Sequence, residues 1–532
     1  MTNTDDDIGS DPPEPVTVLP AGPNDGPDNP HRLAAGYLGG RGAAGWPAAL
    51  VYWRSDFHRY QAGSYQALPE DDQRGELTEW VRSEYVRVHA AERAAWLAAG
   101  DTARGKAPQV RRVTTGLIRD VLQALRGMCL LPAAVEAPAW INGATGPDPT
   151  RLLPLRNGIL DLSADLAGGL LPATPDFFST TAAPLNYDHA AALPAEWLRF
   201  LRELWPDDEE SRAALQEWFG YLLTPDTRHQ KILFILGPRR AGKGTITRVL
   251  RELVGPANVA GPTLGSLATN FGLSALLGRS VAIVSDARLS SRSDAAVITE
   301  RLLSISGEDV LTVDRKFRDP LSVKLNARFV VVSNELPKLA DTSGALAGRF
   351  FPLLLSRSWF DREDTALFDR LRAELPGILL WAVEGWRRLR ERGRFVQPCS
   401  AAGLVEDMED LASPIKVFLR ERCAVGPGQR VEVSELYREW CRWCSTTGQR
   451  DAGTHATFGR DIRAAVPTAV KARLRTPEGR LHVYTGIRLR DDSDPDHDAS
   501  VAGGQGGHSG HSAPPLDAGN EPGLSESHGT AL

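Results

Sequence analysis

A glycine-rich segment at residues 237–245 has the residue types and the spacing of a phosphate-binding loop. The short apolar run 231–236 leads into it, and a helix-like run, 246–253, follows. In this context the loop turns backbone N–H groups toward phosphate oxygens, the helix N-terminus adds its positive dipole, and Lys243 reaches the β and γ phosphates. We therefore expect a bound nucleoside triphosphate, held by Gly237, Pro238, Arg239, Arg240, Ala241, Gly242, Lys243, Gly244 and Thr245.

The position after the loop lysine departs from the usual pattern. It is Gly244, where Ser or Thr normally ligates Mg²⁺, and the hydroxyl comes one residue later, on Thr245. We expect Thr245 to hold Mg²⁺, directly or through water. The same Gly-Lys-Gly-Thr run also occurs in adenylate-kinase-like loops, so a nucleoside monophosphate kinase-like phosphotransferase is an alternative.

Two later apolar strands also end in polar side chains. The run 281–284 ends at Ser285 and Asp286, where a carboxylate can hold Mg²⁺ and its water, although a strand-terminal Asp is also a common turn former. The run 327–332 ends at Ser333 and Asn334, whose amide can orient a water molecule that attacks the γ phosphate. Three strand tips would thus bring an ammonium, a carboxylate and an amide around one triphosphate.

A single arginine, Arg349, lies among the small residues of the segment 344–350. Taken alone, an arginine before a phenylalanine is more often a surface ion pair. After the three strand tips, it can also stabilise transition-state charge on a nucleotide bound by a neighbouring subunit.

In this order the motifs resemble the phage and plasmid primase family, whose ATPase is a superfamily 3 helicase related to the poxvirus primase-helicase. The resemblance covers at least residues 156–448. The segments that carry it, besides the phosphate loop, are 174–181 (TPDFFSTT), 216–225 (QEWFGYLLTP), 285–288 (SDAR), 305–309 (ISGED), 333–337 (SNELP) and 374–378 (ELPGI).

The resemblance implies a P-loop, AAA+-like core in a hexameric ring that holds ATP and Mg²⁺ between subunits and translocates on single-stranded or forked DNA during replication. By position, Lys243 and Thr245 belong to Walker A, Asp286 to Walker B, and Asn334 to the sensor of motif C. Arg349 resembles the finger supplied in trans. The Walker B position has one acidic residue where many relatives have two. The second acid is Glu300, Glu308 or absent. A non-catalytic, ATP-binding replication initiator remains a further alternative.

The segment 307–320 corresponds to the B′ motif of that family. It contains a basic cluster with one aromatic residue, flanked by strand-like residues: Arg315, Lys316, Phe317 and Arg318. Such a loop suits gripping backbone phosphates and stacking on a base. The alternative is a solvated surface hairpin.

Residues 400–490 read helix, helix, helix, hairpin, which is the order of a winged helix. In that fold a helix enters the DNA groove while basic residues of the hairpin contact phosphates. The candidates here are Lys471, Arg473, Arg475 and Arg480. Many winged helices bind proteins instead. We expect Cys441 and Cys444, the one CxxC pair, to be structural rather than metal ligands.

The remaining divisions follow from pattern and composition. Residues 31–150 are expected to form a small α+β module, 151–225 a helical collar-like domain, and 226–395 the P-loop domain. The module shows no DxD pair, so primer synthesis is not supported here, and a primase on a separate polypeptide is a possible partner. The module then docks that partner or covers the collar.

The charge of the 532-residue chain is unevenly distributed. The net charge is −6, but residues 1–30 carry seven acids and 491–532 carry eight, with no Lys or Arg in either segment. Residues 31–490 therefore hold 61 basic and 52 acidic side chains, a net of +9 that favours a polyanionic partner. Both ends are expected to be disordered acidic tails. With no apolar run long enough to cross a membrane and few cysteines, we expect a cytoplasmic protein.

Overall fold

The structure is a computed structural model that describes residues 26–40, 49–99, 105–165, 167–287, 294–337, 345–448, 452–476 and 479–491. Apart from residues 26–30 and 491, the two expected acidic tails lie outside the described residues. The chain divides into two compact units, residues 1–414 and 415–532. Among the described residues, none of the helices combines the length and the apolar character needed to cross a bilayer.

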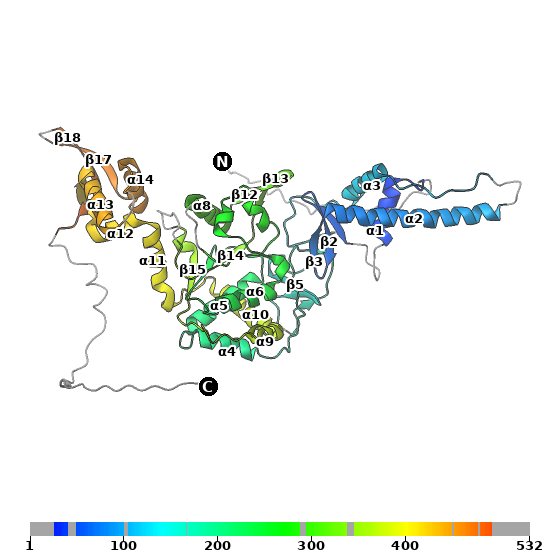
Figure 1. Cartoon of the computed structure of the whole chain (residues 1–532), viewed down its shortest axis with the longest axis horizontal. Helices are drawn as coiled ribbons and strands as arrows, with labels where there is room; N and C mark the ends of the chain where they lie inside the picture. The colour runs from blue at the N-terminus through cyan, green and yellow to red at the C-terminus, as the bar shows by residue number, and fades with distance from the viewer. Residues whose placement is uncertain are drawn as a thin grey trace, which may run out of the picture. The chain divides into compact units, whose positions relative to one another are not determined.

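The first unit begins with a small antiparallel sheet and three helices (Figure 1). These elements are α1 (Pro30–Gly40), β1 (Leu50–Trp53), β2 (Asp56–Gln61), β3 (Ser64–Leu68), α2 (Glu70–Ala98) and α3 (Thr115–Met128). In α2 the buried side chains Leu77, Val81 and Tyr85 recur every four residues, so one stripe of the helix meets the core. Figure 1 shows the rest of this long helix extending away from the sheet.

Short strands connect this module to the core. They are β4 (Ala139–Trp140), β5 (Leu152–Leu155), β6 (Gly158–Asp161), β7 (Leu170–Leu171) and β8 (Phe177–Phe178), with the 3-10 turn η2 (Pro149–Arg151) before β5. Leu155 pairs with Gly158, so the two residues of the β5–β6 turn are Arg156 and Asn157.

A five-stranded parallel sheet forms the centre of the first unit. Its strands lie in the order β10 (Val259–Ala260), β11 (Val281–Val284), β14 (Arg328–Ser333), β9 (Ile232–Leu236) and β15 (Phe350–Leu354). These strands are almost wholly buried because both faces are covered, as is usual for parallel sheets. Alternate residues of β9 enter two different cores: Leu233 and Ile235 one, Ile232 and Phe234 the other.

One face of the sheet is covered by α4 (Ala195–Leu204), α5 (Glu209–Leu222), α6 (Lys243–Val254), α9 (Leu367–Ala373) and α10 (Leu375–Arg392). Residues from Leu153 to Leu389 contribute to this single core. Side chains on both sides of the domain boundary expected at residue 225 therefore pack together. The expected collar, 151–225, is also not purely helical, since its first half consists of strands. The α5–α10 contact is close enough that a Cβ on Gly220 would lie 2.2 Å from the Ala382 carbonyl oxygen.

The other face carries shorter elements. They are α7 (Leu264–Leu267), η4 (Gly272–Leu276), α8 (Ala295–Ser306), the hairpin β12 (Val310–Arg315) and β13 (Arg318–Lys324), η5 (Ala347–Arg349) and α11 (Ala402–Ala412). Two further 3-10 turns, η3 (Pro256–Asn258) and η6 (Cys399–Ala401), contact α6 and the start of α5. Met408 of α11 joins the core on this face.

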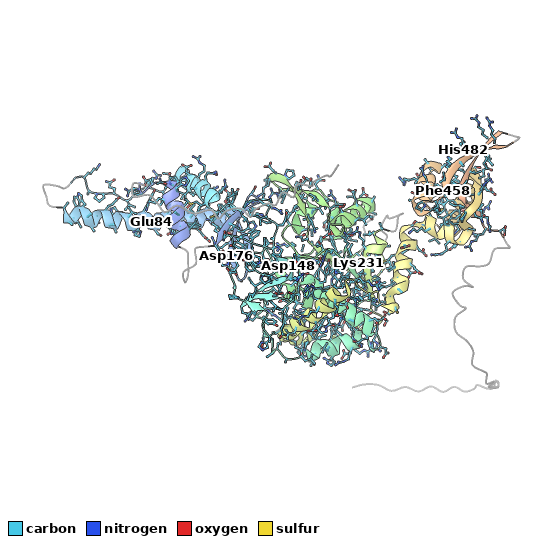
Figure 2. The ribbon with its side chains drawn as sticks, turned by 180° about the vertical axis from the view of Figure 1, so that it is seen from behind. Glu84, Asp148, Asp176, Lys231, Phe458 and His482 are labelled. Carbon is cyan, nitrogen blue, oxygen red and sulfur yellow. The ribbon has the colours of Figure 1, made fainter. Side chains whose placement is uncertain are left out.

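The second unit combines three helices with a three-stranded sheet. Its elements are α12 (Pro414–Arg422), β16 (Cys423–Glu432), α13 (Val433–Thr447), α14 (His455–Ala465), β17 (Val470–Thr476) and β18 (Gly479–Leu489), with strand order β16-β18-β17. The helices and the hairpin lie where the sequence predicts them, whereas β16 is additional. Cys444 is buried in the core and Cys441 packs against it; both are free thiols. Figure 2 labels Phe458 in the body of this unit and His482 on the β17–β18 hairpin.

Candidate nucleotide-binding site

The three polar strand tips lie at the same edge of the parallel sheet. Val331 of β14 pairs with Phe234 of β9 and with Val284 of β11. Two residues further along each strand, Ser333, Leu236 and Asp286 are therefore at the same level. Adjacent strands are about 4.8 Å apart, so Asp286 lies roughly 10 Å from the end of β9, with Asn334 between them.

The loop that follows β9 is held in shape by its neighbours. Arg240 and Gly242 have positive φ angles of 58° and 87°. A Cβ on Gly242 would lie 2.9 Å from Leu204 Cδ2 and 3.2 Å from the Phe200 ring, so α4 packs against the loop where glycine is needed. On the other side, the Ser358 hydroxyl donates to the Arg239 carbonyl oxygen (2.8 Å).

Lys243 joins the loop to the tip of β14. Its ammonium donates to the carbonyl oxygens of Gly237 and Pro238, each at 2.6 Å, and to Asn334 Oδ1 at 2.8 Å. The residue is only 8% exposed, and burial lowers the pKa of its ammonium. All three acceptors are neutral, so the positive charge is not cancelled and can act on an anion. Phosphate oxygens that enter the loop would replace the carbonyl partners.

The residues expected to hold Mg²⁺ are compatible with such an ion. Thr245 is half-buried in the first turn of α6, and its hydroxyl makes no hydrogen bond with any described residue. A Cβ at Gly244 would have no atom within 4 Å, so open space adjoins this turn. Asp286 is exposed at the sheet edge. Mg²⁺ prefers oxygen ligands and uses few protein groups beside phosphates and water.

Arg349 does not join this group within one chain. It is the last residue of η5, and the next residue, Phe350, pairs with Ile232 at the start of β9. The five residues of β9 place Arg349 about 16 Å from the phosphate loop, at the opposite edge of the sheet. Its guanidinium packs against Gly307, where a Cβ would lie 3.3 Å from Nη2, and its buried Nη1 has no hydrogen-bond partner among the described residues. Residues 338–344 of the preceding segment lie outside the described residues, as does Arg288 of the 285–288 motif.

The expected B′ segment is a hairpin with a basic, aromatic tip. Arg315 of β12 pairs with Arg318 of β13, which leaves Lys316 and Phe317 as the turn. Phe317 is 92% exposed, and the Lys316 ammonium lies 5.1 Å from its ring centroid. Arg318 forms a 2.5 Å ion pair with Asp56 of β2.

Glu308 belongs to the base of this hairpin and not to the nucleotide site. Its carboxylate accepts a hydrogen bond from the Thr227 hydroxyl and forms a 2.7 Å ion pair with Lys324. These contacts keep its pKa below the usual range. Glu308 is therefore not the second Walker B acid that the sequence left open, while Glu300 is exposed on α8.

The hairpin of the second unit presents a basic row. Lys471, Arg473 and Arg475 alternate along β17, are all exposed, and therefore share one face. Arg475 lies directly opposite Arg480 of β18. Two like charges opposite each other are unfavourable, and a polyanion bound here would relieve their repulsion.

One functional contact was not predicted from the sequence. Both carboxylate oxygens of Glu374, which lies between α9 and α10, accept hydrogen bonds from the first backbone N–H groups of α4: Glu196 at 3.0 Å and Trp197 at 2.9 Å. This cap fixes the helix that packs against Gly242. The motif 374–378 in the sequence gives no sign of this long-range partner.

Two family models match parts of the chain. Residues 53–206 match the family described as D5 N terminal like. This match supports kinship with phage primase-helicases. Residues 235–349, which include Lys243, Asp286, Asn334 and Arg349, match a family of unknown function (DUF5906).

Solved structures give a weaker likeness. The apo structure of the NrS-1 C terminal region has 13% identity and a TM-score of 0.40, and the alignment covers 82% of this chain and 95% of that one. The A form apo structure of the same region has 15% identity and a TM-score of 0.36, with 56% and 77% covered.

Proposed function

We propose that the chain is an ATP-dependent DNA helicase of the superfamily 3 type that acts in phage or plasmid replication. The observation that carries the proposal is the contact between Lys243 and Asn334 at the sheet edge where Asp286 also lies. It brings a cation for phosphates and an amide for water into one place, beside a carboxylate on the next strand.

In the proposed reaction, the loop N–H groups and Lys243 bind the β and γ phosphates. Thr245 and Asp286 hold Mg²⁺, which when bound supplies charge neutralisation at the phosphate oxygens. Asn334 orients a water molecule for attack on the γ phosphorus. A nucleoside monophosphate kinase would instead have to exclude water and hold a phosphate oxygen of the monophosphate as the acceptor, so an amide directed at this position favours hydrolysis.

Arg349 is too far from the phosphate loop of its own chain to contact a nucleotide bound there. We therefore propose that the chains assemble into a ring. A guanidinium at the opposite sheet edge can contact transition-state charge only when another subunit's nucleotide lies against it. A cyclic arrangement, which we propose to be a hexamer, pairs each loop with the next subunit's Arg349.

DNA is proposed to contact two surfaces. The β12–β13 tip offers an exposed ring and adjacent cations, which suit stacking on a base and binding backbone phosphates of a single strand. The second unit is proposed to be a winged helix whose β17–β18 hairpin contacts phosphates.

The test is ATP hydrolysis by the full chain with and without single-stranded DNA, together with unwinding of a forked duplex. We expect Mg²⁺-dependent hydrolysis that single-stranded DNA stimulates and that Lys243→Ala abolishes. Phosphoryl transfer to a nucleoside monophosphate would establish the kinase alternative. ATP-dependent assembly without turnover would establish the initiator alternative.

A further inference from the structure

A large cavity lies at the amino edge of the central sheet, away from the phosphate loop. Its volume is about 730 Å³. The walls include the β1–β2 turn with Arg54 and Asp56, the β5–β6 turn with Arg156, and the residues Arg279 and Ser280 that precede β11. The β12–β13 hairpin contributes Arg318. Figure 1 shows β2, β3 and β5 on this side of the unit.

The lining is strongly basic. It contains seven Lys or Arg side chains and two carboxylates, Asp56 and Glu136. The same wall also holds polar groups from residues 179–181. Positive charges that line a concave surface reinforce one another, so the cavity concentrates anions.

Two of these cations have no partner to neutralise them. Arg156 is exposed and Arg279 is half-buried, and neither forms an ion pair or a side-chain hydrogen bond with a described residue. They come from different walls, the β5–β6 turn and the start of β11. By contrast, Arg54 pairs with Glu136 and Arg318 with Asp56.

We propose that this cavity binds the phosphodiester backbone of a single strand of nucleic acid. The inference rests on the proposed function and adds a third contact site, between the N-terminal module and the sheet. A single strand is flexible enough to follow a recess of this kind, whereas a duplex is stiff over many base pairs.

The Asp56–Arg318 pair adds a specific consequence. Asp56 holds the hairpin arginine against the module in a 2.5 Å contact, within the cavity lining. A phosphate that enters must compete with this carboxylate for Arg318. Removing the carboxylate charge should therefore strengthen binding, whereas removing Arg156 and Arg279 should weaken it.

The experiment measures binding of a fluorescent oligothymidylate by the full chain over a range of salt concentrations. The test variant is Arg156→Gln with Arg279→Gln. The matched control is Arg82→Gln with Arg119→Gln, two arginines whose side chains are 74% and 80% exposed and lie outside the cavity. Both variants lose two positive charges, but the control arginines lie outside the cavity and are paired with Glu79 and Asp120.

We expect the test variant to reduce the slope of log affinity against log salt by about 1.4, or about 0.7 per phosphate contact, and the control to leave it unchanged. Asp56→Asn should raise the affinity for the oligothymidylate severalfold. A gain in binding of this kind cannot be attributed to misfolding. Inorganic tripolyphosphate should compete poorly, because it spans fewer phosphate positions than a strand.

Equal slopes in the test and control variants would overturn the proposal, as would weaker binding by Asp56→Asn. So would tripolyphosphate binding that the oligonucleotide cannot displace, which would identify a small polyphosphate as the ligand. ATP hydrolysis without DNA should be unchanged in all these variants. If the unaltered chain does not hydrolyse ATP but the test variant still changes the salt slope of binding, the helicase function is refuted. The cavity then remains a nucleic-acid site.

Discussion

The Lys243 ammonium donates a 2.8 Å hydrogen bond to the side-chain oxygen of Asn334, which joins the first turn of α6 to the tip of the neighbouring strand β14. This contact depends on strand order, because β14 lies beside β9 although 91 residues separate the two side chains. It places the amide next to the position where the γ phosphate would bind. Substitution of Lys243 and substitution of Asn334 should therefore have different effects on nucleotide binding and on turnover.

Asn334→Ala should lower the ATP turnover number by roughly 10²-fold and leave nucleotide binding nearly intact, since the amide acts on water and not on the bound phosphates. Lys243→Ala should instead weaken binding itself. Phosphate release and equilibrium binding of a non-hydrolysable ATP analogue measure the two effects. Loss of binding in Asn334→Ala at unchanged turnover would contradict the assigned role.

The hydroxyl that serves Mg²⁺ can be identified by a pair of substitutions. Thr245→Ala should raise the Mg²⁺ concentration needed for half-maximal hydrolysis at least tenfold, because it removes the proposed oxygen ligand. Gly244→Ser should have little effect, since the site has open space for the new side chain. Titrations of hydrolysis against Mg²⁺ at saturating ATP provide the comparison. If only Gly244→Ser changes the curve, Thr245 is not the ligand.

Action of Arg349 on a neighbouring subunit predicts complementation. Arg349→Ala and Lys243→Ala should each be inactive alone, but a mixed oligomer regains activity at the interfaces that join an intact loop to an intact finger. In a random equal mixture these are about a quarter of the interfaces if one finger serves one loop. Hydrolysis is measured after mixing and reassembly. Mixtures as inactive as the separate variants would contradict action in trans.

The sequence predicted the elements of the nucleotide site better than their arrangement. The strands around Phe234, Val284 and Val331 are continuous apolar runs, a pattern that follows from burial on both faces and is local. Strand order and the Glu374 cap are not local, because they depend on contacts between residues far apart in the chain. For the same reason the sequence did not show that α4 and α5 share one core with the sheet.

The additional strand β16 was missed for a different reason. It contains Gly426, Pro427 and Gly428, which normally interrupt strands. The structure accommodates them because β16 pairs only with β18 and shifts register between Val425 and Arg430. An edge strand tolerates such an irregularity, and sequence pattern alone could not place this segment at an edge.

The exposed ring of Phe317 predicts a selective effect on DNA. Phe317→Ala should weaken binding of single-stranded DNA by roughly 5-fold to 150-fold, corresponding to about 1–3 kcal/mol for one stacked base. ATP hydrolysis without DNA should not change. Leu193→Ala, which removes another exposed apolar side chain, is the control. Equal DNA binding by the two variants would mean that the hairpin is only a solvated surface.

Two histidines, the buried His58 and the half-buried His229, predict that mild acid destabilises the first unit. Burial lowers the pKa of His58 and of His229, so each stays neutral in the folded chain at pH values where the unfolded chain begins to take up a proton. The free energy of unfolding should therefore be highest above the ordinary histidine pKa of about 6.5 and should fall as the pH drops below it. Carboxylates with lowered pKa lose their charge only at lower pH, so they contribute little between pH 7.5 and 5.5.

The contribution of His229 can be isolated because its ring lies between Tyr221 and Phe395, with centroids 5.2 Å and 5.1 Å away. His229→Phe keeps an aromatic ring there and removes the proton-binding group, so the melting temperature should fall less between pH 7.5 and 5.5 than in the unaltered chain. His229→Gln should also flatten this dependence, but from a lower starting stability, because the ring contacts are lost. If both variants keep the original pH dependence, protonation of His229 does not contribute to acid unfolding.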